Sequence, residues 1–141
     1  MPRIMKTAAF VFGGLIIIVL LIGWLFAMLA PGCEDTTCET LFSPDRSHKV
    51  ILYTRNCGAT TGFSTHIALA KSDEDINDGT TIFVADDGYG EANLHPVYQA
   101  LIDIRARWID NHSLELSYER KARLFTEKVK ADGITIIHRK R

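Results

Sequence analysis

The longest hydrophobic stretch of the chain covers residues 8–30, which are 23 consecutive residues without a charge. As an α-helix this stretch would be about 34 Å long. The hydrocarbon core of a bilayer is about 30 Å thick. A helix that is apolar on every side has no role in a small soluble domain, because it leaves no face for water. The pattern therefore predicts a single N-terminal transmembrane helix over residues 8–30.

The charges that flank this stretch predict its orientation. Arg3 and Lys6 precede it, and Glu34, Asp35 and Glu39 follow it. Because Lys and Arg are retained on the cytoplasmic side, residues 1–7 are expected in the cytoplasm and the remainder of the chain outside. In a bacterium this would be a single-pass inner-membrane protein with its C-terminal domain in the periplasm.

Two other uses of the hydrophobic stretch remain open. A cleaved secretory signal has an apolar core of about 7–15 residues, which is shorter than the run observed here. A lipoprotein signal would place an acyl chain on Cys33, which follows Leu29-Ala30-Pro31-Gly32. The length favours a retained anchor, then a lipoprotein anchored through Cys33, and last a secreted protein.

The pattern changes after the hydrophobic stretch. Residues 31–46 are polar and predict a linker that ends in the turn signal Ser43-Pro44-Asp45. Alternating polar and apolar residues over 47–141 predict one extracytoplasmic β domain, with Trp108 buried in a central strand. Strands are expected at 48–55, 63–70, 80–85, 102–108, 114–118 and 134–138, and residues 120–130 form a strand or a short helix. The expected fold is mainly β, an antiparallel sandwich or barrel-like sheet of about six or seven strands.

Charge narrows the class of partner. The net charge is −1, which argues against a nucleic-acid partner. The distribution is uneven: residues 31–100 have 4 Lys+Arg against 11 Asp+Glu, whereas residues 101–141 have 10 against 6. The two halves either pair through surface charge or present a basic face, formed by the C-terminal strands, to a partner or to lipid headgroups.

Three cysteines, at positions 33, 38 and 57, follow the hydrophobic stretch. In an oxidising compartment they allow one disulfide and one remaining thiol. We predict a Cys38–Cys57 bridge, which closes a loop of about 20 residues and is worth roughly 3 kcal/mol. Cys33 is then left for a lipid, a free thiol or an intermolecular bridge. The cysteine and histidine spacings do not match a zinc site.

Catalytic and metal motifs are weak. Asp73, Asp75 and Asn77 resemble the start of a calcium loop, but the glycine and the final carboxylate are displaced from their required positions. Ser64 and His66 share one face of a strand without the surroundings of a hydrolase nucleophile. We therefore assign no catalytic residue, no metal ligand and no cofactor.

The most distinctive run covers residues 55–65, with two glycines, four hydroxyl groups and an arginine. It is either a pinned loop whose hydroxyls satisfy backbone groups or a polar recognition loop on a rigid scaffold. The candidate recognition residues are Arg55, Thr60, Thr61, Ser64 and Thr65.

This run, with Cys38-Glu39 and Ser43-Pro44-Asp45 before it, resembles a group of small bacterial envelope proteins and lipoproteins. Members carry a Cys near the mature N-terminus, an S-P-D-G turn and the run R-D-C-G-A-T-T-G-F-S-T. The chain departs from this pattern at Arg46 and Asn56, where the group has Gly and Asp. The resemblance implies a bacterial envelope setting and a Cys38–Cys57 bridge, and implies no activity.

The sequence thus favours a membrane-anchored extracytoplasmic binding module, not an enzyme, with the membrane and a protein as its partners. A specific version is an immunity-type protein that neutralises a toxin acting in the envelope. The alternative is a structural or accessory subunit of an envelope complex, for which a large exposed apolar patch would be the mark.

Overall fold

The computed structural model describes residues 3–29, 32–58 and 61–141, and the chain divides into the units Met1–Gly32 and Cys33–Arg141. The first unit contains helix α1 (Arg3–Leu29), which begins five residues before the predicted span. From Lys6 onward α1 is long and apolar enough to cross a membrane, a property that signal sequences share.

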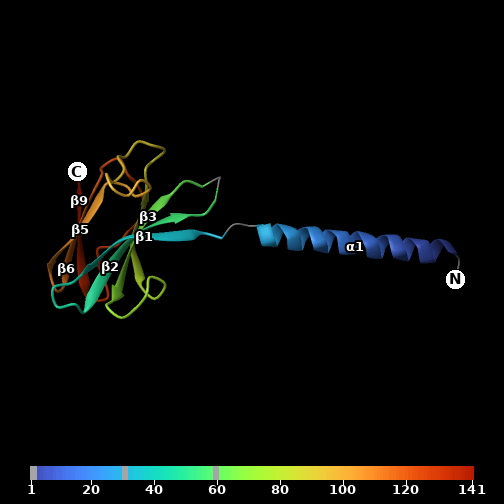
Figure 1. Cartoon of the computed structure of the whole chain (residues 1–141), viewed down its shortest axis with the longest axis horizontal. Helices are drawn as coiled ribbons and strands as arrows, with labels where there is room; N and C mark the ends of the chain where they lie inside the picture. The colour runs from blue at the N-terminus through green and yellow to red at the C-terminus, as the bar shows by residue number, and fades with distance from the viewer. Residues whose placement is uncertain (1–2, 30–31, 59–60) are drawn as a thin grey trace. The chain divides into compact units, whose positions relative to one another are not determined.

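The second unit is formed by nine strands in two sheets, so it is mainly β, as predicted (Figure 1). The five-stranded sheet is antiparallel and has the order β1 (Glu34–Phe42), β2 (His48–Asn56), β3 (Ser64–Lys71), β4 (Thr80–Asp86) and β7 (Arg123–Glu127). The four-stranded sheet has the order β5 (Ile104–Asp110), β6 (Ser113–Tyr118), β9 (Ile134–Lys140) and β8 (Lys130–Ala131).

The four-stranded sheet is mixed, because β6 pairs in parallel with β9. Its hairpins are the predicted ones: β5 and β6 turn at residues 111–112, and β8 and β9 turn at Asp132-Gly133. Asp132 and Gly133 both have positive φ, of 48° and 78°, as a tight hairpin turn requires. The parallel β6–β9 pair arises because β7, which follows β6 in the chain, belongs to the five-stranded sheet. The chain then re-enters the four-stranded sheet as β8 and β9.

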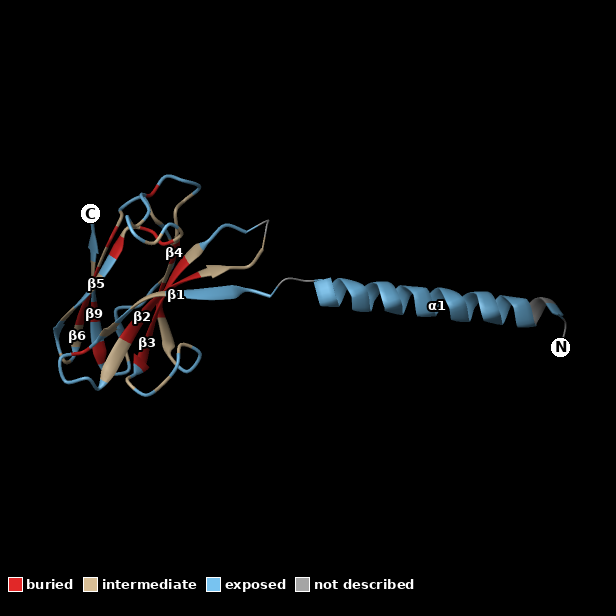
Figure 2. Cartoon of the chain, viewed as in Figure 1, coloured by how far each residue is buried: buried red, intermediate tan, exposed pale blue. Residues whose placement is uncertain are grey.

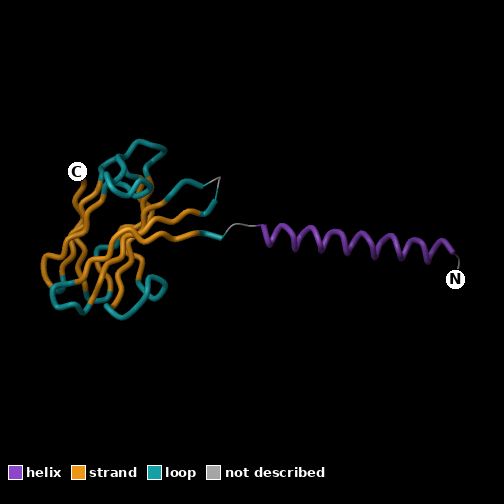
Figure 3. Tube along the Cα trace, in the orientation of Figure 1, coloured by secondary structure: helices purple, strands orange, loops and turns teal. Residues whose placement is uncertain are grey.

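The main core lies between the two sheets (Figure 2). The five-stranded sheet contributes Val50, Leu52, Ile67, Leu69, Ile82, Phe83 and Ala85. The four-stranded sheet contributes Ile104, Leu114, Leu116, Tyr118, Ile134 and Ile136. Leu101 and Ile102, from the segment before β5, complete the same cluster. Burial alternates along β7 and only in part along β6 and β9. The central strands β2 and β3 are buried on both faces, because a smaller cluster of Ile51, Tyr53 and Ala68 packs against Ile76 on the outer side. Loops connect the strands at their ends (Figure 3).

Two details differ from the sequence prediction. The linker predicted over residues 31–46 is instead occupied by strand β1, whose polar residues are mostly exposed at the edge of the sheet. Trp108 was expected in a central strand but lies in β5, at the edge of its sheet, and is only partly buried. Its Nε1–H donates a hydrogen bond of 3.1 Å to the carbonyl oxygen of Leu41 on β1. Of the two alternatives for residues 120–130, the strand is found, over residues 123–127.

Candidate functional site

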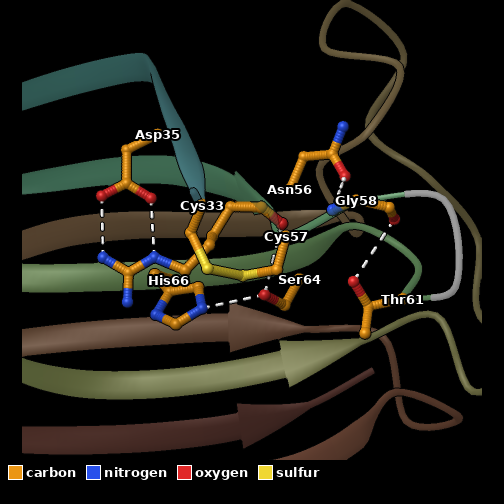
Figure 4. The surroundings of a disulfide bond; sticks show 9 residues. Cys33, Asp35, Asn56, Cys57, Gly58, Thr61, Ser64 and His66 are labelled. Atoms are coloured by element: carbon orange, nitrogen blue, oxygen red, sulfur yellow. Dashed lines mark hydrogen bonds and ion pairs between the residues drawn. A yellow bond between two sulfur atoms is a disulfide. The ribbon is translucent and has the colours of Figure 1, made fainter. Parts of the chain in front are cut away.

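The disulfide joins Cys33 to Cys57, so the predicted Cys38–Cys57 bridge is wrong (Figure 4). The register of the β1–β2 hairpin explains the pairing. Glu34 lies opposite Asn56, which places Cys33 and Cys57 opposite each other one step further along, with their Cα atoms 4.0 Å apart. The bond also occupies the sulfur that lipidation of Cys33 would need, so the structure contradicts an acyl chain at that residue.

Cys38 has a free thiol and lies further along β1, in the same hairpin. It is the extra residue of a β-bulge in β1, five residues and therefore about 16 Å along the strand from Cys33. Its side chain packs against the core, and its Sγ lies 3.7 Å from the carbonyl oxygen of Thr36. Burial raises the pKa of the Cys38 thiol, which makes it a poor nucleophile.

The candidate recognition residues are only partly brought together. Arg55, Thr61 and Ser64 line a hollow on the outer face of the five-stranded sheet. Thr65 does not, because side chains alternate along β3 and Thr65 points inward. It is buried, and its hydroxyl accepts a hydrogen bond of 3.0 Å from the Ile102 amide. Thr60 lies outside the described residues.

A cluster of polar side chains lies beside the disulfide, where β2 ends and β3 begins (Figure 4). The guanidinium of Arg55 donates two hydrogen bonds of 2.7 Å to Asp35 on β1, which lowers the pKa of Asp35. Ser64 Oγ and His66 Nε2 are hydrogen bonded at 2.9 Å, and the His66 ring stacks on Tyr53. Both oxygens of Asp35 are held by Arg55, so the group does not have the arrangement of a Ser-His-Asp triad.

His66 predicts a pH dependence of stability. Its ring is buried, and burial followed by the charge of Arg55 lowers its pKa below the usual 6.5. The unfolded chain therefore takes up the proton first, so the free energy of unfolding falls as the pH drops below about 6.5. We expect His66→Gln, which keeps a hydrogen-bonding side chain beside Ser64 but cannot titrate, to flatten this fall.

The measurement is urea unfolding of the full chain in detergent micelles at about pH 7 and about pH 5. His112→Gln removes an exposed imidazole from the β5–β6 turn and serves as the matched control. An equal slope of stability against pH in wild type and His66→Gln would contradict the prediction.

The hollow beside these residues is an open groove of about 430 Å³, within the range of ligand sites. Three exposed aromatic side chains from separate segments line it: Phe63 before β3, Tyr89 after β4 and Phe125 on β7. We call it the aromatic groove. Its full lining is Arg55, Cys57, Thr61, Gly62, Phe63, Ser64, Val84, Asp86, Tyr89, Arg123 and Phe125.

Tyr89 is held in a conformation that favours exposure. Its φ is +63°, which is rare for a bulky residue, and it lies between Gly88 and Gly90, whose φ values are also positive. The residue is 88% exposed, and it lies outside the buried clusters of the domain. Strained residues of this kind are concentrated at functional sites.

Arg123 organises the wall of the groove opposite Phe63. Its guanidinium stacks on the rings of Tyr89 and Phe125, at 4.5 Å and 5.1 Å from the ring centroids. It also donates two hydrogen bonds to the Asp86 carboxylate. Partial burial raises the pKa of Asp86, but the bonds from Arg123 and from the Gly88 amide outweigh this effect and lower it.

A second surface is the outer face of the four-stranded sheet, where arginines alternate with inward apolar residues. Arg107 on β5 and Arg139 on β9 both donate hydrogen bonds to Glu115 on β6, and these bonds lower the pKa of Glu115. The two guanidinium side chains remain 69% and 65% exposed. With Arg105, which is also exposed on β5, they form the basic face of the C-terminal strands.

Sequence reasoning missed one side of the groove, namely Tyr89, Arg123, Phe125 and the role of Asp86. The local signal was the run Gly88-Tyr89-Gly90, since glycines on both sides of an aromatic residue mark an exposed turn. The comparisons with known proteins add no further residues. No protein-family model, no curated protein and no solved structure matches this chain.

Proposed function

We propose that the protein is a membrane-anchored binding module that takes up its ligand in the aromatic groove, outside the cytoplasm. The observation that carries the proposal is the convergence of Phe63, Tyr89 and Phe125, all exposed, around the Arg123–Asp86 pair. Exposed aromatic side chains on a rigid scaffold supply large contact areas at a small cost in conformational entropy.

The setting rests on α1 and on the disulfide. Arg3 and Lys6 at the start of α1 favour a cytoplasmic N-terminus. The Cys33–Cys57 bond favours an oxidising compartment for the β domain. With the resemblance to bacterial envelope proteins, this supports a single-pass inner-membrane protein whose domain is in the periplasm.

Topology can be tested with a reporter that is active only outside the cytoplasm. Fused after Arg141, it should be active, and intact-mass measurement should find an unprocessed N-terminus. A reporter with the opposite requirement, fused at the same position, should be inactive. Activity of that cytoplasmic reporter would contradict the proposed orientation.

Ligand uptake at the groove can be tested in cells without knowing the ligand. A photo-reactive phenylalanine analogue at position 89 or 125 should form adducts, whereas the same residue at Ile109, exposed on β5, should not. Equal adduct formation at all three positions, or none at any of them, would contradict the groove as the binding site.

The second candidate function is that of an accessory subunit of an envelope complex with a protein partner. The observation that favours it is the basic face, where Arg105 and Arg107 on β5 and Arg139 on β9 are exposed on either side of β6 and suit an acidic protein surface. Charge reversal at Arg105 and Arg107 would then release the protein from its complex, whereas Tyr89→Ala would not.

A further inference from the structure

The two guanidinium groups of the aromatic groove are already paired with carboxylates of the same domain. Arg55 is bound to Asp35 and Arg123 to Asp86, each through two hydrogen bonds. A phosphate or carboxylate ligand would have to displace a bidentate partner to gain an equivalent bond. The pairs therefore lower the preference of the groove for anions.

The same pairs also disfavour a purely apolar ligand. An apolar ligand would cover the two ion pairs and remove their charged groups from water without offering new hydrogen bonds, which costs free energy. A ligand with hydroxyl groups avoids this cost, because one hydroxyl can donate to a carboxylate oxygen and accept from a guanidinium N–H. The charge pattern thus favours a neutral ligand that is rich in hydroxyl groups.

The aromatic side chains define the rest of the ligand. Tyr89, Phe125 and Phe63 are 88%, 58% and 51% exposed. Arg123 covers part of the Tyr89 and Phe125 rings, and the remaining ring surface is available for contact. The electron-rich face of an aromatic ring attracts weakly polarised C–H and O–H groups. A sugar ring carries such C–H groups on its face and hydroxyls on its edge, which fits rings and ion pairs placed side by side.

The groove is larger than a single small ring, since its volume is about 430 Å³. Phe63 also lines two smaller hollows, of about 220 Å³ and about 290 Å³. The larger of these contains Cys38 and Tyr98, which pack against the core, so it lies on the other side of Phe63 from the aromatic groove. The volume of the aromatic groove itself is what favours a ligand of more than one ring.

We infer that the aromatic groove binds a neutral oligosaccharide, with sugar rings on Tyr89, Phe125 and Phe63 and hydroxyls on the Arg123–Asp86 and Arg55–Asp35 pairs. This inference rests on the proposed function, since it names the ligand of the same groove. An extended peptide that adds a strand to the sheet would use the free edge of β7 and not the groove, because β7 is the last strand of its sheet. Within the groove, the backbone groups of β4 and β7 bond each other and leave mainly side chains for a ligand.

The test uses the full chain in phosphatidylcholine nanodiscs, which avoids detergents with sugar headgroups. The probes are the tetrasaccharides of N-acetylglucosamine, β-1,4-glucose and α-1,4-glucose, followed by saturation-transfer NMR and calorimetry. At least one should bind saturably, with the strongest transfer to its ring C–H protons. Because no counterions are released, its affinity should change little between about 50 mM and about 500 mM NaCl.

Matched variants assign the binding to the groove. Tyr89→Ala and Phe125→Ala should each weaken binding about tenfold or more, whereas Ile109→Ala should not. Tyr89→Gly should lose binding as well, while it keeps the fold, because glycine accepts the positive φ without strain.

The inference is overturned if none of the three probes binds, or if binding is unchanged in both Tyr89→Ala and Phe125→Ala. It is also overturned if dextran sulfate binds in place of the neutral probes. Protease-sensitive adducts at position 89 without binding of any saccharide would leave the groove as a binding site and remove only its assignment to sugars. The absence of adducts at both positions 89 and 125 would remove both.

Discussion

Replacing Cys33 or Cys57 by serine is expected to lower the free energy of unfolding of the β domain by about 3 kcal/mol. The bond closes a loop with a sequence separation of 24 between β1 and β2, and without it the unfolded chain gains the entropy of that loop. The first strand then loses its covalent attachment at the exposed edge of the sheet. Urea unfolding of the full chain in micelles, followed by near-ultraviolet circular dichroism, measures the effect.

Cys38→Ser is the matched control for this experiment. The thiol is free and only partly buried, so we expect a change below about 1 kcal/mol. A reducing agent should destabilise wild type and Cys38→Ser equally and leave Cys33→Ser unchanged. A peptide that links Cys38 to Cys57 in non-reducing digests would contradict the pairing.

The disulfide shows why turn positions alone do not predict a pairing across a hairpin. Next to the β1–β2 turn, Phe42 pairs with Lys49, and this register extended along the strands would place Cys33 one residue away from Cys57. The bulge at Cys38 shifts the register by one residue, so that Glu34 lies opposite Asn56 and Cys33 meets Cys57. The pairing was also missed because β1 lacks the apolar alternation of a half-buried strand and was interpreted as a linker.

The aromatic groove is a second example. Its side chains can be read from the sequence, but no local pattern shows that they come together. The strands were predictable from their β-branched and aromatic content and, for β5 and β6, from apolar residues that alternate with period two. The run at residues 55–65, singled out for its polar residues, contributes one side of the groove. The other wall comes from β7, which pairs with β4 although Asp86 and Arg123 are 37 residues apart. No local pattern specifies that pairing, because the intervening chain forms a hairpin of the other sheet.

Phe83 and Phe125 provide a second large expected effect, because they lie on paired strands and differ in burial. Phe83 is 0% exposed in the core, against the ring of Tyr118, whereas Phe125 is 58% exposed in the groove. Phe83→Ala should lower the free energy of unfolding by about 3–5 kcal/mol, since it leaves a cavity between the sheets. Phe125→Ala removes the same atoms from a surface position and should cost less than about 1 kcal/mol.

The pair separates the fold from the binding function in one experiment. Urea unfolding should rank Phe83→Ala far below Phe125→Ala in stability. Below the unfolding transition, adduct formation at position 89 and saccharide binding should be retained in Phe83→Ala and lost in Phe125→Ala. If Phe125→Ala destabilised the domain as much as Phe83→Ala, the ring would be part of the core, and its exposure could not be used as evidence for a binding surface.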